Sequence, residues 1–355
     1  MIKHLEKVPV INKLKQRLFT DWIKPSQLKQ AGILNMNKRN VDYIARYNDR
    51  SAYPLVDNKL KTKLVLKEYE VSSPKLLEVI TEQHEIKGFR ELVQKLDGFA
   101  IKPAKGSGGK GILVITGRDG DAFVKPSGSK VDLADIQRHL SNILAGLYSL
   151  GGSPDVAVVE SLVRCEPMLA NYSYQGVPDI RIVAFKGYPV MAMLRLSTQA
   201  SDGKANLHQG AVGVGLDICT GEALHAVQFD RSIEHHPDTG QPLNAIKIDD
   251  WQKLLVMASR CFEATNLGYM GVDIVIDEEH GPLLLELNAR PGLAIQMANG
   301  TGLLPRLRAV EALRRPHFTA EERVAWSMAH LGAASKPLSQ PATEIEASEP
   351  VAVGA

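Results

Sequence analysis

Apolar and polar residues alternate along several short stretches of this chain, and the most informative stretch lies in its C-terminal half. Residues 283–292 read LLLELNARPG and follow the turn-forming sequence EEHGP at 278–282. The stretch before this turn, residues 270–276, reads MGVDIVI. Two apolar runs that flank a Gly-Pro turn predict a pair of antiparallel strands joined as a hairpin.

The second of these predicted strands carries polar residues inside an apolar run. Because side chains alternate between the two faces of a strand, Glu286 and Asn288 should share one face, while Leu285 and Leu287 point into the core. The first strand carries Asp273, and the hairpin brings it close to the two polar residues. Carboxylate and amide oxygens are ligands that Mg²⁺ prefers, so the pattern predicts a magnesium site that would also contact substrate phosphates. The alternative is a stabilising polar cluster at a sheet edge.

A glycine-rich segment follows another predicted strand. Residues 99–103 (FAIKP) form this strand, and residues 105–111 read KGSGGKG before a further strand at 112–116. The backbone amides of the glycines can cradle an anion, and Lys102 and Lys110 add positive charge. A P-loop is excluded because no Ser or Thr follows Lys110, and a strand follows instead of a helix. We therefore predict a glycine-rich flap over a nucleotide phosphate; a mobile hairpin without a ligand is the alternative.

Apolar residues at helical spacing predict the helices. Asp132 is placed to cap a helix that runs to about Leu150, and Asp249 and Asp250 form an acidic start for a helix that ends at Thr265. Further helices are predicted at 59–69, 303–315 and 318–331.

The N-terminal part of the chain is basic. Residues 1–63 contain fourteen Lys and Arg against five Asp and Glu. Residues 11–23 (INKLKQRLFTDWI) predict a basic amphipathic helix. Such a helix can cover the main domain, or it can dock on an anionic membrane or a protein partner.

Composition narrows the class of protein. The 355 residues are 44% hydrophobic and 23% charged, with a net charge of +2, which is typical of a globular enzyme with two or three subdomains and indicates no nucleic-acid partner. The widely spaced cysteines Cys165, Cys219 and Cys261 favour a reducing compartment over a disulfide framework. No apolar run is long enough to span a membrane, and Lys3 and Lys7 interrupt any signal-peptide pattern. We therefore expect a cytoplasmic protein, and the sequence predicts no particular oligomeric state.

Two polar patterns stand near strand ends. Residues 179–185 (DIRIVAF) predict a strand with Asp179 and Arg181 at its start, and its hairpin partner ends near Arg195. Glu160 follows the apolar residues 156–159, so it begins a hinge-like connector or is an ordinary strand-end carboxylate.

Two loops carry histidines. The polar loop at 201–210 brings Lys204, Asn206 and His208 together, which is typical either of plain surface or of a ligand-binding loop. The pair His235 and His236 lies in a loop rich in Pro, Asp and Gly, and we predict that both are solvated turn residues.

In their order and spacing, these motifs resemble the ATP-grasp superfamily and, within it, the α-L-glutamate-ligase-like (RimK-like) group. The resemblance extends over residues 58–302. Its motifs are NKLKTK at 58–63, the strand lysine and glycine-rich flap at 101–111, the hinge at 160–163, DIR at 179–181, KANLHQG at 204–210, GVD at 271–273 and ELNARPG at 286–292. Each motif alone is weak, whereas the ordered set is specific.

The resemblance implies an α+β ATP-grasp fold, in which two α+β subdomains grip ATP. We expect a basic helical N-terminal segment at 1–57, a central subdomain with the flap at 58–163, a C-terminal subdomain with the metal site at 164–315, and a helix with a disordered tail at 316–355. The short N-terminal segment stands where the family has a full α/β domain. Other departures are Asn58 in place of Asp, an insertion at 165–177, and Arg290 in place of a small residue.

The resemblance also implies an activity and its residues. The expected reaction is ATP-dependent joining of a carboxylate to an amine through an acyl phosphate, with glutamate or another amino acid added to a peptide or small molecule. Asp273, Glu286 and Asn288 would hold one or two Mg²⁺ or Mn²⁺ ions. The residues expected to bind ATP are Lys59, Lys102, Gly106, Ser107, Gly108, Gly109, Lys110, Glu160, Ser161, Leu162, Val163, Asp179, Lys204 and Asn206.

Arginines would complete the site. Arg290 and Arg195 are the expected catalytic residues, with Arg181 as a further candidate, because a guanidinium binds carboxylates through two parallel hydrogen bonds. A structural salt bridge is the alternative for each. At the level of function, the alternatives are an ATP-grasp kinase that phosphorylates a hydroxyl and a nucleotide-binding regulator without turnover.

Overall fold

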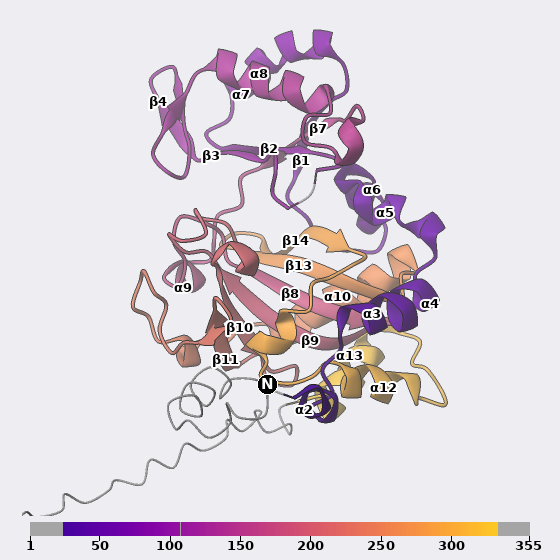
Figure 1. Ribbon diagram of the computed structural model, residues 1–355. Coiled ribbons are helices and arrows are strands. Elements are labelled where there is room, and N and C mark those ends of the chain that lie inside the picture. Colours follow the sequence, from indigo (N-terminus) through magenta and orange to yellow (C-terminus); the bar gives the residue numbers. More distant parts are fainter. Residues whose placement is uncertain (1–23, 107, 333–355) are drawn as a thin grey trace, which may run out of the picture.

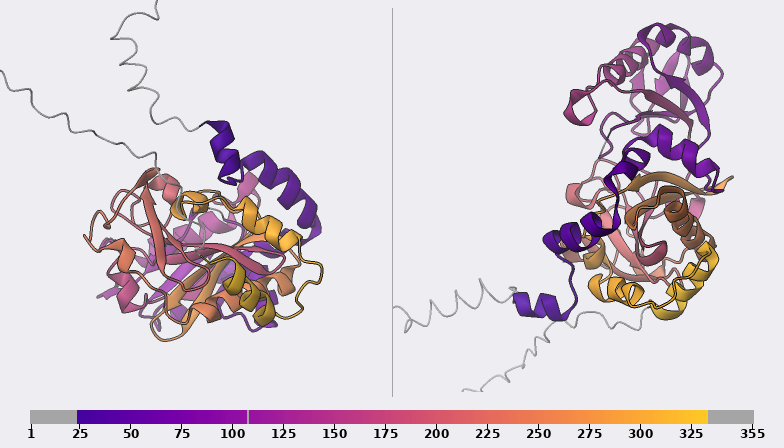
Figure 2. Two further views of the ribbon diagram at one scale, coloured as in Figure 1. Left: turned by 90° about the horizontal axis from the view of Figure 1, so that it is seen from below. Right: turned by 90° about the vertical axis from the view of Figure 1, so that its right-hand side faces the viewer.

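The computed structural model describes residues 24–106 and 108–332. The helix predicted at 11–23, Ser107 of the flap and the tail from Ala333 lie outside the described residues. The described chain forms two α+β parts, one above the other in Figure 1, with N-terminal helices along one side (Figure 1, Figure 2). None of the described helices is long and apolar enough to cross a membrane.

The upper part is built on an antiparallel sheet in the strand order β1-β7-β2-β3. Its strands are β1 (Leu76–Ile80), β2 (Phe99–Pro103), β3 (Leu113–Ile115) and β7 (Ala157–Ser161), and a small second sheet contains β4 (Gly117–Asp119), β5 (Ala122–Val124) and β6 (Lys130–Val131). Its helices are η4 (Gln83–Lys87), α7 (Phe89–Val93), α8 (Leu133–Leu144) and η5 (Leu150–Gly152). The prediction that the glycine-rich segment joins two antiparallel strands, β2 and β3, is confirmed.

Helix α8 packs its apolar face on the upper sheet. Ile136, Leu140 and Ile143 recur at helical spacing and are fully buried in one cluster with the sheet. Asp132 caps the helix as predicted, since its Oδ1 accepts a hydrogen bond from the Asp135 amide at 2.7 Å. The helix ends at Leu144 instead of Leu150, because Gly146 adopts a left-handed conformation (φ 80°) that stops it.

The lower part is an antiparallel sheet in the order β12-β11-β10-β9-β8-β13-β14. Its strands are β8 (Asp179–Phe185), β9 (Tyr188–Leu196), β10 (Val212–Leu216), β11 (Ala223–Gln228), β12 (Arg231–Ser232), β13 (Tyr269–Asp277) and β14 (Gly281–Asn288). Its helices are α9 (Pro167–Ala170), η6 (Leu207–Gln209), η7 (Leu243–Ala245), α10 (Trp251–Thr265), α11 (Ile295–Ala298), α12 (Leu304–Glu311) and α13 (Ala320–His330). The predicted acidic cap of α10 is wrong, because Asp250 has a left-handed backbone and its side chain makes no cap hydrogen bond.

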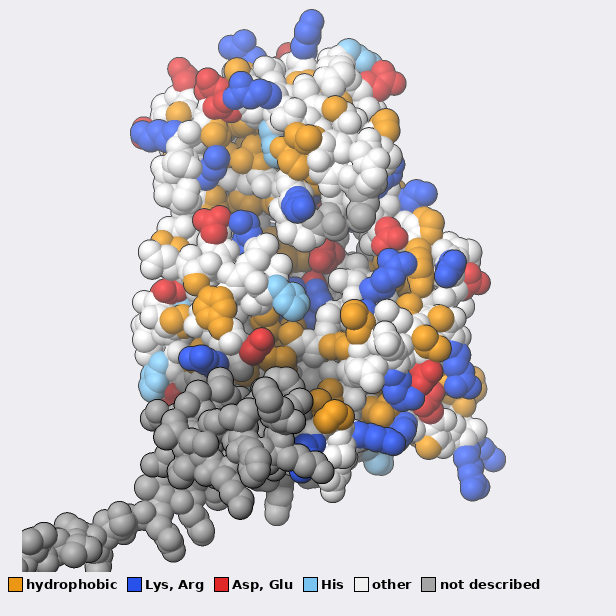
Figure 3. Space-filling model, in the orientation of Figure 1, with side chains coloured by type: hydrophobic (Ala, Val, Ile, Leu, Met, Phe, Trp, Pro, Cys, Tyr) orange, Lys and Arg blue, Asp and Glu red, His pale blue; other side chains and the backbone are white. Residues whose placement is uncertain are grey.

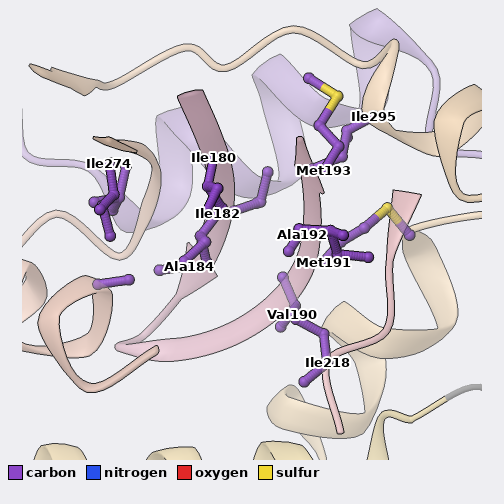
Figure 4. Packing of buried hydrophobic residues seen from close by; sticks show 14 of the residues in the cluster. Ile180, Ile182, Ala184, Val190, Met191, Ala192, Met193, Ile218, Ile274 and Ile295 are labelled. Carbon is purple, nitrogen blue, oxygen red and sulfur yellow. The ribbon is translucent and has the colours of Figure 1, made fainter. Parts of the chain in front are cut away.

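A large hydrophobic cluster lies under this sheet. Ile180 and Ile182 of β8 and Ile274 of β13 belong to it (Figure 4). Helices α10 and α13 pack against this part of the sheet. The core therefore fixes which faces of β8 and β13 remain for polar side chains.

The N-terminal helices pack onto the lower part. They are α2 (Pro25–Gln30), α3 (Met36–Lys38), η2 (Arg39–Ile44), α4 (Ala45–Tyr47), η3 (Arg50–Ala52), α5 (Pro54–Asp57) and α6 (Lys59–Lys67). Leu34 and Leu66 are buried in the lower cluster. The buried residues of the upper hydrophobic cluster begin in β1, with Ile80.

The predicted pairing within the C-terminal hairpin is present, with one irregularity. Asp273 of β13 lies opposite Glu286 of β14, whereas the next residue, Ile274, lies opposite Leu284. Leu285 is the extra residue of a β-bulge and is half-buried. The prediction that Leu285 points into the core is therefore wrong, whereas Leu287 is buried as predicted.

Candidate functional site

A buried carboxylate held by two lysines lies on the upper side of the junction between the two parts. Glu160 lies near the end of β7 and is 4% exposed. The Nζ atom of Lys102, from β2, lies 2.6 Å from Glu160 Oε2, and the Nζ atom of Lys63, from α6, lies 2.8 Å from Oε1. We call Glu160, Lys63 and Lys102 the lysine cluster.

Burial and the neighbouring charges act in opposite directions on Glu160 and on Lys63. Burial opposes the ionisation of Glu160, but Lys102 and Lys63 outweigh burial and hold the pKa of Glu160 below its ordinary value. Burial lowers the pKa of Lys63, although Glu160 acts in the opposite direction. The cluster carries one more positive than negative charge, which suits an anionic ligand.

Lys59 lies between the upper and lower parts. Its Nζ donates a hydrogen bond to the carbonyl of Gly106 at 2.7 Å and lies 3.6 Å from Glu286 Oε2. Its backbone amide donates to Ala104 O at 2.8 Å. One lysine therefore joins the root of the glycine-rich segment to the polar face of β14.

The glycine-rich segment is anchored at its ends and open at its tip. Asp155 accepts hydrogen bonds from the Lys105 amide at 2.9 and 3.1 Å, and His139 contacts Gly111 O at 2.9 Å. Gly108 and Gly109, at the tip, have positive φ angles of 62° and 75° and open space around them. Such angles favour glycine and leave backbone amides exposed to a ligand. Lys110 is exposed beside them.

The lower sheet gathers polar side chains on one face. The strand register pairs Asp273 with Arg181 and with Glu286, and it pairs Asp179 with Arg195. Side chains of directly paired residues point to the same face, so strands β8, β9, β13 and β14 all contribute to it. Figure 3 shows charged side chains of both signs around the hollow between the upper and lower parts.

Two arginines and two aspartates form a buried network on this face. Arg181 binds Asp273 through two hydrogen bonds, one of them from Nη2 to Oδ2 at 2.6 Å. Nη2 of Arg195 donates to Asp273 Oδ2 at 2.8 Å and to Asp179 Oδ2 at 2.7 Å. We call these four residues the arginine cluster.

Burial and charge act on the two aspartates with opposite results. Burial, reinforced by Asp273, outweighs Arg195 and raises the pKa of Asp179 to about 6. Burial would also raise the pKa of Asp273, but Arg181 and Arg195 reverse the effect and lower it to about 2. The same two aspartates hold the pKa of Arg195 well above its usual range against the effect of burial.

The residues predicted to bind metal lie together and fit a divalent cation in part. Glu286 has a partly exposed side chain, and its charged neighbour is the amine of Lys59. Asn288 Oδ1 accepts one hydrogen bond, from the Arg290 amide at 2.8 Å. Asp273 accepts three hydrogen bonds from arginines; with about four lone pairs on a carboxylate, this leaves one, on Oδ1. Among the described residues, no group of three or more His, Cys, Asp or Glu side chains is placed to hold a metal, so a divalent cation at this place would need the amide oxygen of Asn288 as a donor.

Comparison with known proteins gives the family. A family model described as sugar-transfer associated ATP-grasp matches residues 38–312. The chain belongs to this family. Its two α+β parts are the two subdomains of the ATP-grasp fold. A search of curated protein sequences finds no match to this chain.

Solved structures that resemble this ATP-grasp chain have low identity to it. The ATP-grasp ligase PsnB, complexed with a minimal precursor, is 15% identical with a TM-score of 0.40 over 74% of this chain and 62% of its own. D-alanyl-alanine synthetase A from Vibrio cholerae is 12% identical, with a TM-score of 0.45 over 79% and 67%. D-cycloserine synthetase DcsG is 13% identical, with a TM-score of 0.44 over 81% and 80%. Similarity at this level bears on neither the substrate nor the activity.

The hinge of the ATP-grasp chain directly follows the lysine cluster. Ser161 ends β7, its amide donates to Lys75 O at 2.9 Å, and its hydroxyl accepts from the Lys75 amide at 3.0 Å. Leu162 packs beside Gly98, and Val163 follows in irregular structure. A cavity of 320 Å³ opens here, lined by Ser161 and Leu162 together with the turn between β13 and β14.

The side chains of Lys204 and Asn206 make local contacts within the loop at 201–210. Lys204 pairs with Asp202 at 3.0 Å and is half-exposed, and the Asn206 side chain accepts a hydrogen bond from the His208 amide at 3.1 Å. The structure brings none of the three predicted loop residues, Lys204, Asn206 and His208, into contact with either cluster.

Two residues of functional interest differ from their predictions. Lys63 was not among the residues predicted to bind a ligand, but it is buried against Glu160; the available signal was its spacing of four residues from Lys59, which places both lysines on one side of α6. The prediction that His236 is solvated is wrong. It is 1% exposed and its Nε2 lies 3.1 Å from Ser197 O, because its loop folds back on the end of β9.

Proposed function

We propose that the protein is an ATP-dependent carboxylate–amine ligase that works through an acyl phosphate. The observation that carries the proposal is the position of Lys59, which contacts Gly106 of the flap and lies 3.6 Å from Glu286 of the oxygen-donor strand. The amine of Lys59, the flap of the upper subdomain and a hard oxygen donor of the lower one thus meet at one point. Phosphoryl transfer from ATP needs this combination of charges.

The upper subdomain would hold the nucleotide. Lys59 and Lys102 would bind its phosphates, with Gly106, Ser107, Gly108, Gly109 and Lys110 of the flap over them and Glu160, Ser161, Leu162 and Val163 at the hinge. Lys102 has a flexible side chain, so its Nζ can exchange Glu160 for a phosphate oxygen. Asp179, Lys204 and Asn206 are the remaining proposed ATP ligands. The local contacts of the last two mean that their loop would have to move.

The lower subdomain would hold the metal. Glu286 and Asn288 have oxygen lone pairs that accept no hydrogen bond from the described residues, and Asp273 retains one on Oδ1. These residues would bind one or two Mg²⁺ or Mn²⁺ ions, which neutralise charge on phosphate oxygens when bound. Arg195 and Arg181 orient Asp273 from the side away from Glu286. Arg195 would also place positive charge near the reacting carboxylate. Arg290, the other predicted catalytic arginine, is exposed two residues after Asn288 and would contact the substrate.

The proposed reaction needs no cofactor beyond ATP and the divalent metal ion. An oxygen of the substrate carboxylate attacks the γ-phosphorus, the bond to ADP breaks, and the acyl phosphate forms. The amine attacks the acyl carbon, phosphate leaves, and the amine loses a proton. The flap, anchored by Asp155 and His139, would keep water away from the acyl phosphate.

The substrate class follows in part from the family. We propose that the acid is glutamate, another amino acid or a sugar acid, and that the acceptor is a peptide or small molecule, since the matching family is associated with sugar transfer. Cys165, Cys219 and Cys261 are free thiols, which supports a reducing, cytoplasmic location.

The test is ADP release over a matrix of acids and amines, with mass spectrometry of the products. A ligase releases ADP only when both an acid and an amine are present and yields their condensation product. A stable phosphoester that forms without an amine would identify a kinase and contradict the proposal.

Replacement of the proposed metal ligand Glu286 tests the site within the same assay. Glu286→Gln should lower kcat by at least about 100-fold, because the neutral amide binds a divalent cation weakly. Glu278→Gln is the matched control, because Glu278 is exposed in the turn at the other end of the same hairpin. Equal activity of the two variants would remove Glu286 from the site.

A further inference from the structure

The N-terminal segment reaches the loop that follows the oxygen-donor strand. The guanidinium carbon of Arg290 lies 4.9 Å from the centre of the Tyr53 ring. Arg290 is exposed, and it forms no ion pair with a carboxylate of the described residues. An arginine without an acidic partner, two residues from the proposed metal ligand Asn288, needs an explanation.

The backbone around Arg290 is fixed on both sides. Its amide donates to Asn288 Oδ1 at 2.8 Å, and Arg39 Nη1 donates to Pro291 O at 2.8 Å. Pro291 packs over Gly271, where an added Cβ would lie 2.9 Å from Pro291 Cβ. The guanidinium therefore projects from a rigid loop.

The same loop is tied to the N-terminal helices a second time. The Asn48 side chain is buried and donates to Tyr269 O at 2.7 Å and to Ala289 O at 3.3 Å. Asn48 Oδ1 accepts from the Tyr269 amide at 2.8 Å. The N-terminal helices thus hold both the start of β13 and the residue before Arg290.

Stacking on a tyrosine prepares an arginine for a planar anion. The ring covers one face of the guanidinium, restricts its rotation and leaves the N–H groups along its edge free. Those N–H groups match the two oxygens of a carboxylate or phosphate. Arg181 and Arg195 do not offer this surface, because Asp273 and Asp179 already occupy them.

We propose that Tyr53 and Arg290 form a recognition site for an anionic group of the substrate, a carboxylate or a phosphate other than the carboxylate that is activated. Arg39 is a positioning residue, which acts through the carbonyl of Pro291. The inference rests on the proposed ligase function and adds that the substrate carries a second negative charge. The N-terminal segment thereby supplies part of the substrate site.

The experiment compares anions with their neutral counterparts. The probes are L-glutamate with L-glutamine, and O-phospho-L-serine with L-serine. Each is titrated calorimetrically into the full-length protein and is also tested in the ADP-release assay with amines. At least one anion should bind the wild type more tightly than its neutral partner, and the preferred pair distinguishes a carboxylate from a phosphate.

Arg290→Gln should weaken binding of that anion by about tenfold or more, since it removes a charged hydrogen-bonding group. Tyr53→Leu should weaken it by about three- to fivefold, the range of a cation–π contact at an exposed site, whereas Tyr53→Phe keeps the ring face and should restore it. Arg39→Gln should raise KM for the anion with kcat unchanged. KM for ATP should stay constant in all four variants.

Arg46→Gln is the matched control. Arg46 is also exposed and lies 5.2 Å from a tyrosine ring, that of Tyr47, but it lines a different cavity of 460 Å³ beside Lys186. The proposal is overturned if no anion binds better than its neutral partner, if Arg290→Gln binds the anion like the wild type, or if Arg46→Gln has an equal effect. Anion binding that depends on Arg290 without any ADP release would instead count against the ligase function alone.

Discussion

The lysine cluster and the arginine cluster both neutralise buried carboxylates, but they do so with different basic side chains. In both, carboxylates with little solvent exposure are satisfied by basic side chains from neighbouring elements. In the lysine cluster, two amines share Glu160. In the arginine cluster, the planar guanidinium of Arg195 joins Asp179 and Asp273.

The contact made by a lysine can be exchanged for another, whereas the contact made by an arginine is fixed. An ammonium group is a point charge on a flexible stem, and it can change partner or lose its proton when buried. A guanidinium keeps its charge and holds its acceptors at set angles. We infer that the upper cluster exchanges ligands during turnover, whereas the lower one is a frame that orients Asp273 beside Glu286.

The largest expected effect follows removal of the central acceptor of the arginine cluster. Asp273→Asn should lower the free energy of unfolding by about 3–5 kcal/mol, because Arg181 and Arg195 remain charged and buried with one carboxylate between them. Urea unfolding at pH 7 measures the change. Asp202→Asn is the control, since the pair of Asp202 with Lys204 is exposed and should contribute less than about 1 kcal/mol. Equal midpoints for the two variants would show that the network is not a stabilising frame.

The next effect concerns pH. Since the folded-state pKa of Asp179 is raised from 3.8 to about 6, the folded protein holds this proton better than the unfolded chain. The contribution of Asp179 therefore stabilises the fold below about pH 4 and is lost as pH rises through about 6. The side-chain amide of the variant Asp179→Asn cannot titrate, so relative to wild type the variant should gain about 2–3 kcal/mol between pH 4 and pH 7. Urea unfolding at several pH values tests this; a constant difference would contradict it.

A smaller loss is expected in the lysine cluster. Glu160→Gln should lower the free energy of unfolding by about 1–2 kcal/mol, the value of a charged hydrogen bond, because Lys63 can give up its proton more readily than an arginine can. Burial already lowers the pKa of Lys63. If Glu160→Gln were as destabilising as Asp273→Asn in the same urea experiment, the distinction between the clusters would be lost.

The smallest change in stability is expected for the residue between the clusters. Lys59→Gln should lower the free energy of unfolding by about 1 kcal/mol, because the hydrogen bond from Nζ to Gly106 O is lost while the contact with Glu286 is long, at 3.6 Å. Instead, the variant should be stabilised less by bound ATP. ATP with Mg²⁺ at about 100 times its dissociation constant stabilises a protein by about 2.7 kcal/mol, and the variant should lose most of this gain at the same concentration. Thermal unfolding with and without ATP measures both effects, and full protection of the variant would exclude Lys59 from phosphate binding.

The parts of the fold that depend on local pattern were predictable from the sequence. Alternation and a Gly-Pro turn were enough to bring Asp273 across the hairpin from the strand that carries Glu286, and the strand pairing confirms the hairpin, whereas the bulge that sets Asp273 directly opposite Glu286 was not predicted. The antiparallel strands around the glycine-rich segment and the cap of α8 by Asp132 followed in the same way. Each of these features is decided by residues that are close in the chain.

The features that depend on distant partners were not predictable. Alternation states which face Arg181 occupies, but not that β8 lies beside β13 in the register that binds it to Asp273. The burial of Lys63 depends on how α6 meets β7, and the burial of His236 depends on a loop folding back on β9. The pairing of Arg290 with Tyr53 joins residues from opposite ends of the described chain.

The β-bulge at Leu285 interrupts the alternation of side chains between the two faces of the sheet along strand β14. Leu284 and Glu286 are two positions apart, yet they face opposite sides of the sheet, because Leu285 takes up the extra step. A regular strand of the same sequence would place both on one side, and either the polar face or the core would then receive the wrong residue. Deletion of Leu285 would remove the bulge and leave every other side chain on its present face. The hairpin can therefore lose one residue at this point without losing the polar face. In an alignment of related sequences, the strand that corresponds to β14 can differ here by a single-residue gap.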